Sequence, residues 1–208
     1  KKADSFGAVV SVQNIKQWKT ALLYPEITAV YANFESFKIS EIISMAEETS
    51  LMGKSVYLIL PHICRQTVYK SLERDLDKLA DIDSIKGFIA KNFEEIALLK
   101  SLYKGKDRKK ETILNYNMYV YNEEAKSFWK ELGINHFTAA VELNYKELKE
   151  LGVSDSDMPV YGYLPLMISA QCVFDNAAAC LKAQAAGRKT QKDEMEAKDG
   201  LLTDRLGK

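Results

Sequence analysis

Residues 85–95 of the chain read Ile-Lys-Gly-Phe-Ile-Ala-Lys-Asn-Phe-Glu-Glu. The first six residues, from Ile85 to Ala90, are a short run of strand-forming composition that predicts a buried β-strand. Asn92 follows this run, and an Asn side chain there accepts a hydrogen bond from the free N–H groups of a first helical turn. Glu95 stands three residues later and gives a capping-box-like pair. The stretch therefore predicts one strand, a short connection and the start of a helix.

The same strand-and-helix unit recurs along the chain. Three further asparagines occupy the junction position, and the last of them is again followed three residues later by a glutamate: Asn14, Asn122, Asn144 and Glu147. Seven segments have strand composition: 8–13, 27–32, 55–60, 85–90, 112–117, 136–141 and 159–163. Strands that alternate with amphipathic helices are typical of βα units around a parallel sheet.

Seven such units predict an α/β fold, a TIM-like (βα) barrel of parallel strands that is incomplete or distorted because an eighth strand is not visible. A doubly wound open sheet is the alternative, but it would normally show a Gly-rich turn after its first strand, and residues 13–16 contain no glycine. We expect residues 1–180 to form the barrel domain. Residues 181–208 are polar and predict a C-terminal arm that leads to a segment absent from this sequence.

Bulk composition narrows the class of protein. The chain has 208 residues, 47% of them hydrophobic, which suits one domain with a sizeable core. Its 29 basic and 29 acidic residues cancel, so no broad nucleic-acid-binding field is expected, although local contact with RNA stays open. No apolar run approaches the roughly 18 residues of a membrane span, and no signal-peptide pattern opens the chain. We therefore expect a cytoplasmic protein without a membrane partner, with its three cysteines reduced.

Residues 161–180 carry most of the candidate chemistry. They read Tyr-Gly-Tyr-Leu-Pro-Leu-Met-Ile-Ser-Ala-Gln-Cys-Val-Phe-Asp-Asn-Ala-Ala-Ala-Cys. Pro165 lacks an N–H group and fixes its own φ, so it interrupts the apolar run. The pattern predicts a strand that ends near Tyr163, followed by a loop that carries Cys172 and Cys180.

Barrel enzymes place their working residues where strands end, and this rule selects Asn33, Glu35, His62, Asn92, Asn117, Glu142 and Tyr161. Of these, Glu142, His62 and Tyr161 are the catalytic candidates. Glu142 follows an apolar strand, where burial would raise the pKa of its carboxyl group and suit it to acid–base work; the alternative is a carboxylate that stabilises a helix start. His62 and Cys64 stand two residues apart. Two ligands are too few for a zinc site, which needs three or four. His136 opens its strand and should lie at the opposite, stabilising end of the barrel.

The late stretch also resembles a known family. Gly162 and the run Ser169-Ala170-Gln171-Cys172, with the phrase at residues 128–133, are similar to the collagenase-like peptidase family U32. The chain departs from many members at Tyr161, where they have His, and at Pro165, where some have Cys. The resemblance implies a barrel that acts as a peptidase on collagen-like or other peptides.

Two other functions stay open under the same resemblance. Some similar proteins are iron–sulfur enzymes that hydroxylate RNA bases or quinone precursors, which implies that Cys172 and Cys180 hold an iron–sulfur cluster completed by downstream thiols in the full-length protein. A non-catalytic barrel, one half of a longer chain, is the third reading. No His-Glu-x-x-His or Gly-x-Ser-x-Gly motif is present to support hydrolysis. Expected partners are a peptide substrate or RNA and the missing flanking segments, without which we expect this fragment to be inactive.

Overall fold

The computed structural model describes residues 7–104, 109–154, 156–165 and 167–169. The chain divides into two units, Lys1–Leu164 and Pro165–Lys208. The predicted boundary near residue 180 stays a prediction, because it falls outside the described residues.

Strands and helices alternate along the first unit, and two short 3₁₀ turns follow β2 and β5. The elements are β1 Ala8–Val12, α1 Ile15–Leu22, β2 Ile27–Asn33, η1 Phe34–Ser36, α2 Ile39–Leu51, β3 Ser55–Ile59, α3 Gln66–Ala80, β4 Ile85–Ala90, α4 Phe93–Leu102, β5 Glu111–Leu114, η2 Tyr116–Met118, α5 Glu123–Glu131, β6 His136–Thr138, α6 Tyr145–Leu151 and β7 Ser156–Asp157. None of the helices in the described part of the chain is long and apolar enough to span a bilayer.

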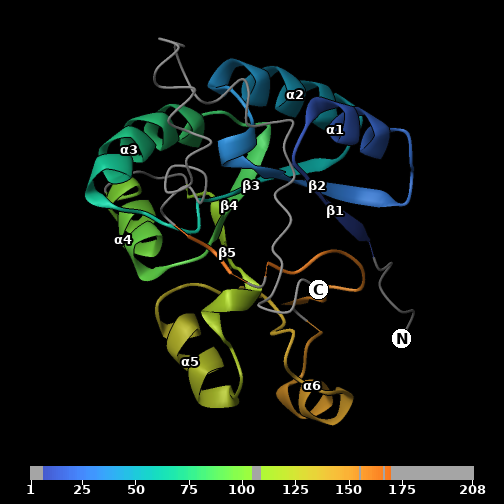
Figure 1. Cartoon of the computed structure of the whole chain (residues 1–208), viewed down its shortest axis with the longest axis vertical. Helices are drawn as coiled ribbons and strands as arrows, with labels where there is room; N and C mark the ends of the chain where they lie inside the picture. Colours follow the sequence, from blue (N-terminus) through green and yellow to red (C-terminus); the bar gives the residue numbers. More distant parts are fainter. Residues whose placement is uncertain (1–6, 105–108, 155, 166, 170–208) are drawn as a thin grey trace, which may run out of the picture. The chain divides into compact units, whose positions relative to one another are not determined.

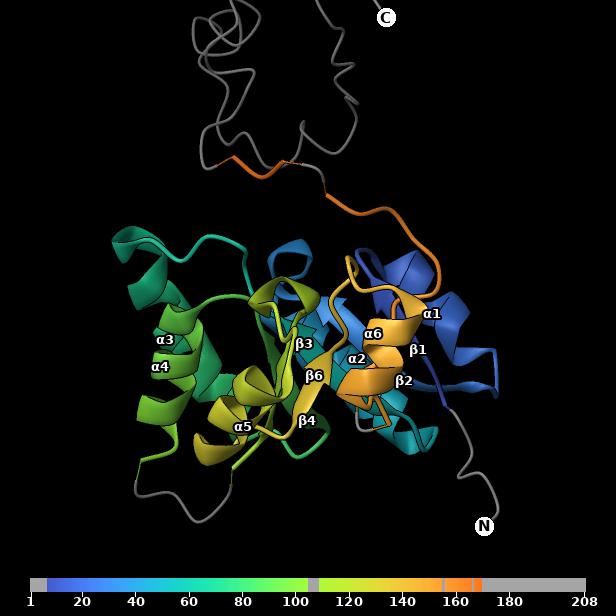
Figure 2. The ribbon, with the colours of Figure 1, turned by 90° about the horizontal axis from the view of Figure 1, so that it is seen from below.

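All seven strands are parallel and lie in one sheet in the order β1 to β7. The sheet curls into a half-barrel, and the helices lie along its outer face (Figures 1 and 2). This confirms the predicted TIM-like, incomplete barrel. The successive βα connections make each strand the neighbour of the one before it.

The seventh strand is shorter and earlier than the sequence predicts. The strand expected at residues 159–163 is wrong: that segment has no regular structure, and the side chain of Val160 is 88% exposed. The observed strand is Ser156–Asp157, which pairs with β6 through Phe137 and Thr138. The sequence prediction relied on apolar composition and therefore placed β7 too late. The two polar residues of β7 are held by pairing with β6 rather than by burial of apolar side chains.

The core lies between the outer face of the sheet and the helices. Side chains alternate along each strand, so Val30, Val56 and Phe88 face outward, where they join a buried cluster with Trp18 of α1 and Leu76 of α3. A second cluster, which includes Leu114, Trp129, Phe137 and Leu151, lies under α5 and α6.

Local helix signals act as the sequence predicts. The side chains of all four junction asparagines accept hydrogen bonds from backbone N–H groups of the following helix: Asn14, Asn92, Asn122 and Asn144. Asn144 and Glu147 form the expected capping box. Glu95 departs from it, since its carboxylate accepts from the N–H of Lys91, one residue before the cap.

Candidate functional site

The C-terminal ends of β3 and β4 bring together three ionisable side chains with shifted pKa values. His62 follows β3, Lys91 follows β4 and Glu95 lies in the first turn of α4. We call this edge of the sheet the carboxyl rim and define it by these three residues together with Asn92 and Asn117. In (βα) barrels this edge carries the active site.

The backbone of Lys91 is fixed from both sides. Its N–H donates to Glu95 Oε2 at 2.8 Å, and its carbonyl oxygen accepts from Asn117 Nδ2 at 2.9 Å. Asn117 Oδ1 in turn accepts from Asn115 Nδ2 at 2.7 Å. Side chains of α4 and of the 3₁₀ turn η2 after β5 therefore set where the Lys91 side chain begins.

Glu95 is a fully buried carboxyl group, with 0% exposure. Burial raises its pKa to about 7, although hydrogen bonds from the backbone of Lys91 and the side chain of Asn92 oppose the shift. Within the described part of the chain its second oxygen, Oε1, has no hydrogen-bond partner. A buried polar atom without a partner costs free energy and calls for an explanation.

Lys91 is also almost fully buried, at 8% exposure. Burial lowers the pKa of its ammonium to about 8, while the charges of Glu95 and Glu35 act in the other direction. Among the described residues no hydrogen bond or ion pair involves Lys91 Nζ. At neutral pH a measurable fraction of this side chain is therefore a free amine.

His62 is neutral at physiological pH. Burial, followed by the nearby charge of Lys91, lowers its pKa to about 4. Cys64 remains a thiol, because burial and the charges of Glu95 and Glu94 raise its pKa. A thiolate nucleophile at Cys64 is thus disfavoured.

The other predicted site residues lie elsewhere on the described surface. Glu142 is an exposed residue in the turn after β6, where it contributes, after desolvation, to the raised pKa of Tyr121. Tyr161 is 100% exposed in irregular backbone. Within the described residues, no hydrogen bond or ion pair joins Glu142, His62 and Tyr161 to one another.

The predicted metal ligands cannot be placed on this site. Cys172 and Cys180 lie outside the described residues. In the part of the chain that the structure does describe, no group of three or more His, Cys, Asp and Glu side chains is arranged to hold a metal ion. The role of Cys172 and Cys180 in an iron–sulfur cluster stays a prediction.

Sequence reasoning missed two residues of the carboxyl rim. Lys91 directly follows the predicted strand, and this position is the signal that could have selected it. The sequence marks Glu95 only as the partner of Asn92 in a capping-box-like pair. Its complete burial depends on packing that no local pattern reports.

A second polar group lies on the inner face of the sheet, nearer the start of the strands. His136 Nδ1 lies 3.0 Å from Glu111 Oε1 and its Nε2 lies 3.4 Å from Asp157 Oδ2. Tyr57 donates to Glu111 at 2.8 Å, and Tyr31 donates to Asp157 at 2.5 Å. We call these five residues the inner network; it ties β2, β3, β5, β6 and β7 together, in keeping with the predicted stabilising position of His136.

Burial alone would lower the pKa of His136, but the hydrogen bonds that its ring N–H groups donate to the carboxylates of Asp157 and Glu111 outweigh burial and raise the pKa to about 9. The pKa of Glu111 is lowered, first by its hydrogen bond with His136. Burial would raise the pKa of Asp157, but its hydrogen bonds with His136 and Tyr31 outweigh burial and lower the pKa. Each of the five residues of the inner network has a hydrogen-bond or ion-pair partner within the network.

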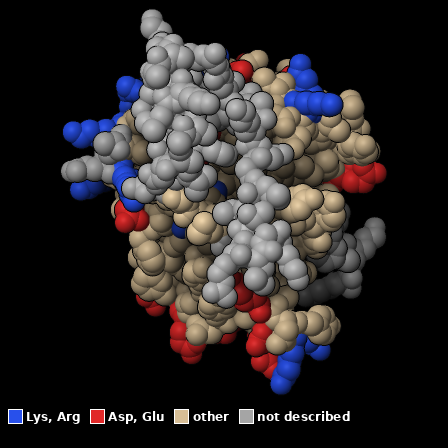
Figure 3. All heavy atoms as spheres, viewed as in Figure 1, with Lys and Arg blue, Asp and Glu red and all other residues tan. Residues whose placement is uncertain are grey.

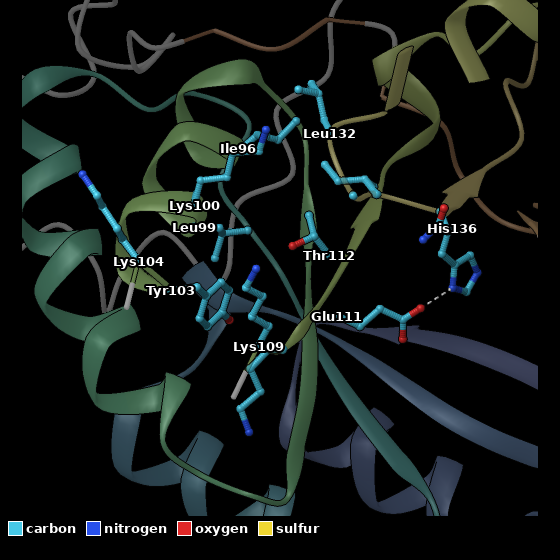
Figure 4. Close-up of a pocket in the computed structure, with 14 residues that line it drawn as sticks. Ile96, Leu99, Lys100, Tyr103, Lys104, Lys109, Glu111, Thr112, Leu132 and His136 are labelled. Atoms are coloured by element: carbon cyan, nitrogen blue, oxygen red, sulfur yellow. Dashed lines mark hydrogen bonds and ion pairs between the residues drawn. The ribbon is translucent and has the colours of Figure 1, made fainter. Parts of the chain in front are cut away.

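A groove of about 600 Å³ opens next to this network, between α4 and the start of β5 and β6 (Figure 4). Its polar lining includes Lys100, Lys104 and Lys109, which are exposed. Lys104 and Lys109 point in different directions (Figure 4). Around the edge of the face in Figure 3, basic and acidic side chains are mixed, as the zero net charge suggests.

Comparison with known proteins adds one finding. The family model of Peptidase family U32 matches residues 28–192. No curated protein and no solved structure matches the chain significantly.

Proposed function

The chain belongs to Peptidase family U32, and from this membership we propose that it hydrolyses peptide bonds at the carboxyl rim. The observation that carries the proposal is Glu95, a buried carboxyl group with a pKa of about 7 and one oxygen without a partner in the described residues. A general base works best when its pKa lies near the working pH. Glu95 meets this condition beside a second ionisable group, Lys91.

In this proposal each rim residue has one role. Glu95 accepts a proton from a water molecule whose oxygen attacks the scissile carbonyl carbon. The ammonium of Lys91, mostly charged below its pKa of about 8, stabilises the oxyanion that forms. As the C–N bond breaks, Glu95 returns the proton to the leaving amine. Neutral His62 accepts a hydrogen bond and orients the water or the substrate.

Glu142 and Tyr161 stay in the proposal as the residues selected from the sequence. Both are exposed, so they are suited to contact a peptide rather than to act in a buried site. A peptide partner and a cytoplasmic location are predictions that accompany this function.

The test compares two glutamates in the third position of their helices. Glu95 is buried, whereas Glu147 of the α6 capping box is exposed. In the protein expressed with its flanking segments, hydrolysis of gelatin and of unstructured peptides should fall at least about 100-fold in kcat for Glu95→Gln, as expected for loss of a general base, with KM little changed. Glu147→Gln should keep its activity within about twofold, since it removes no group of the rim.

Hydrolysis by the Glu95→Gln variant at the wild-type rate, with an unchanged Tm, would remove Glu95 from the mechanism. Glu142→Gln and Tyr161→Phe in the same assay decide the two remaining candidates. Absence of any hydrolysis, together with iron, sulfide and a broad visible absorption band after anaerobic expression, would instead favour the hydroxylase alternative that rests on Cys172 and Cys180.

A further inference from the structure

Three lysines in the described part of the chain are buried to the same degree: Lys54, Lys91 and Lys126, with 9%, 8% and 9% exposure. An ammonium group taken out of water is costly unless it is paired. Two of the three meet this cost in the same way. Lys54 Nζ donates to two backbone carbonyl oxygens, one before β2 and one at its first residue, both at 2.6 Å. Lys126 Nζ donates to two at the end of α6, at 3.1 and 2.8 Å.

Lys91 has no such arrangement. Within the described residues no hydrogen bond or ion pair involves its Nζ. Its position differs as well. Lys54 and Lys126 fasten chain connections, whereas Lys91 follows β4 at the carboxyl rim, two residues beyond the buried inner-face residue Ile89. A buried amine that makes no structural bond, on a backbone fixed from both sides, is suited to reaction with a ligand.

We propose that the ε-amine of Lys91 forms a reversible imine with a small aldehyde or ketone that reaches the carboxyl rim. Lysines that form Schiff bases are activated by desolvation, which keeps a fraction of the amine neutral. The charged groups around this amine are Glu95 and Glu35, with His62 neutral beside them. This activity is separate from peptide hydrolysis and does not depend on it.

The reaction balances with groups present at the rim. The lone pair of the neutral amine forms a C–N bond to the carbonyl carbon, and the carbonyl oxygen takes a proton from the Glu95 carboxyl group. The carbinolamine then loses its hydroxyl group as water, with a proton supplied through the same carboxyl group. The nitrogen gives up both of its protons to the Glu95 carboxylate, one as the carbinolamine forms and one as the C=N bond forms, so one amine and one carbonyl compound yield one imine and one water. Glu95, with a pKa of about 7, can both give and take this proton near neutral pH.

Reductive trapping tests the proposal within a single sample. The protein is incubated with propanal and sodium cyanoborohydride at pH 7.5, and the modified lysines are located and timed by peptide mass spectrometry. The lowered pKa gives Lys91 a roughly 300-fold larger neutral fraction than an ordinary lysine at neutral pH, and part of this advantage is lost to restricted access. We expect Lys91 to react at least about tenfold faster than surface lysines such as Lys149, while Lys54 and Lys126 react more slowly than those.

Two further measurements separate an active amine from an accessible one. The rate of modification at Lys91 should rise with an apparent pKa near 8, below the range of ordinary lysines. Glu95→Gln should slow trapping at Lys91 severalfold, while Glu147→Gln leaves it unchanged.

Trapping at Lys91 no faster than at Lys54 and Lys126, or with an apparent pKa above 10, would overturn the proposal and leave Lys91 as an anion-binding group only. The readout is a mass change at one lysine, so it distinguishes failure of this proposal from failure of peptide hydrolysis.

Discussion

The two histidines of the chain should shift its stability with pH in opposite directions. His136 has its pKa raised to about 9 by the two carboxylates of the inner network, and His62 has its pKa lowered to about 4 by burial and Lys91. A raised folded-state pKa adds stability that is complete below the unfolded-state value and is lost as the pH rises through the folded-state value. For His136 this window runs from about pH 6.5 to pH 9.

The shift from 6.5 to about 9 sets the size of the effect. One pKa unit corresponds to about 1.4 kcal/mol, so His136 contributes at most about 3 kcal/mol at pH 6 and almost nothing at pH 9.5. The side chain of His136 is 28% exposed, and solvent screening makes this figure an upper bound.

The assay is urea unfolding of the wild type and His136→Gln from pH 6 to pH 9.5 at low salt. Fluorescence of Trp18 and Trp129, both buried, reports the transition. Other groups titrate in this range, notably Lys91 and Glu95, so the quantity of interest is the difference between the two proteins at each pH. Above pH 10 unfolded tyrosines ionise, which sets the upper limit of the window.

We expect the wild type to exceed His136→Gln in free energy of unfolding by up to about 3 kcal/mol more at pH 6 than at pH 9.5. His62→Gln is the matched control. Because the pKa of His62 is lowered, the wild type should lose stability relative to this variant as the pH falls from 6.5 toward 4. Parallel curves for the wild type and His136→Gln would refute the charge pairing of the inner network.

Three more changes test other parts of the fold. Lys91→Met should raise the free energy of unfolding by about 2 kcal/mol, because it removes a buried charge without a described partner. Lys126→Met should lower the free energy of unfolding by about 1–3 kcal/mol, because it leaves two carbonyls unpaired. Equal losses of stability for the two variants in chemical denaturation would contradict this difference between Lys91 and Lys126. Gly87→Ala should cost about 1–3 kcal/mol, since the added Cβ would collide with the carbonyl oxygen of Glu111 across the sheet, and an unchanged Tm would show that the strands can separate there. Asn144→Ala should lower the free energy of unfolding by about 1 kcal/mol, because it removes a helix cap. An unchanged stability in thermal unfolding would show that this cap contributes little.

The parts of the fold that follow from local physics were predictable. Six strands match the sequence prediction because apolar residues of strand-forming type recur where the outer face of the sheet is buried. The helix starts at Asn14 and Asn122 follow from short-range hydrogen bonds between a side chain and the next turn. Both signals are contained within a few residues of sequence.

The remaining features depend on partners far along the chain. β7 is two polar residues long and pairs with β6, so no local pattern marks it. The character of Lys91 comes from burial and from a missing acceptor among the described residues, and that of Glu95 from complete enclosure. His62 was selected by its position after a strand, a rule that gives the location of a residue but not its pKa.

The bond between Tyr31 and Asp157 joins residues 126 positions apart. Closing so long a loop is entropically expensive, so this bond should form late, after the folding transition state has been crossed. Weakening it, as in Asp157→Asn, would then accelerate unfolding while leaving the folding rate almost unchanged. The inner network would in that case contribute to kinetic stability: it would set the unfolding rate of the curled sheet rather than its folding rate.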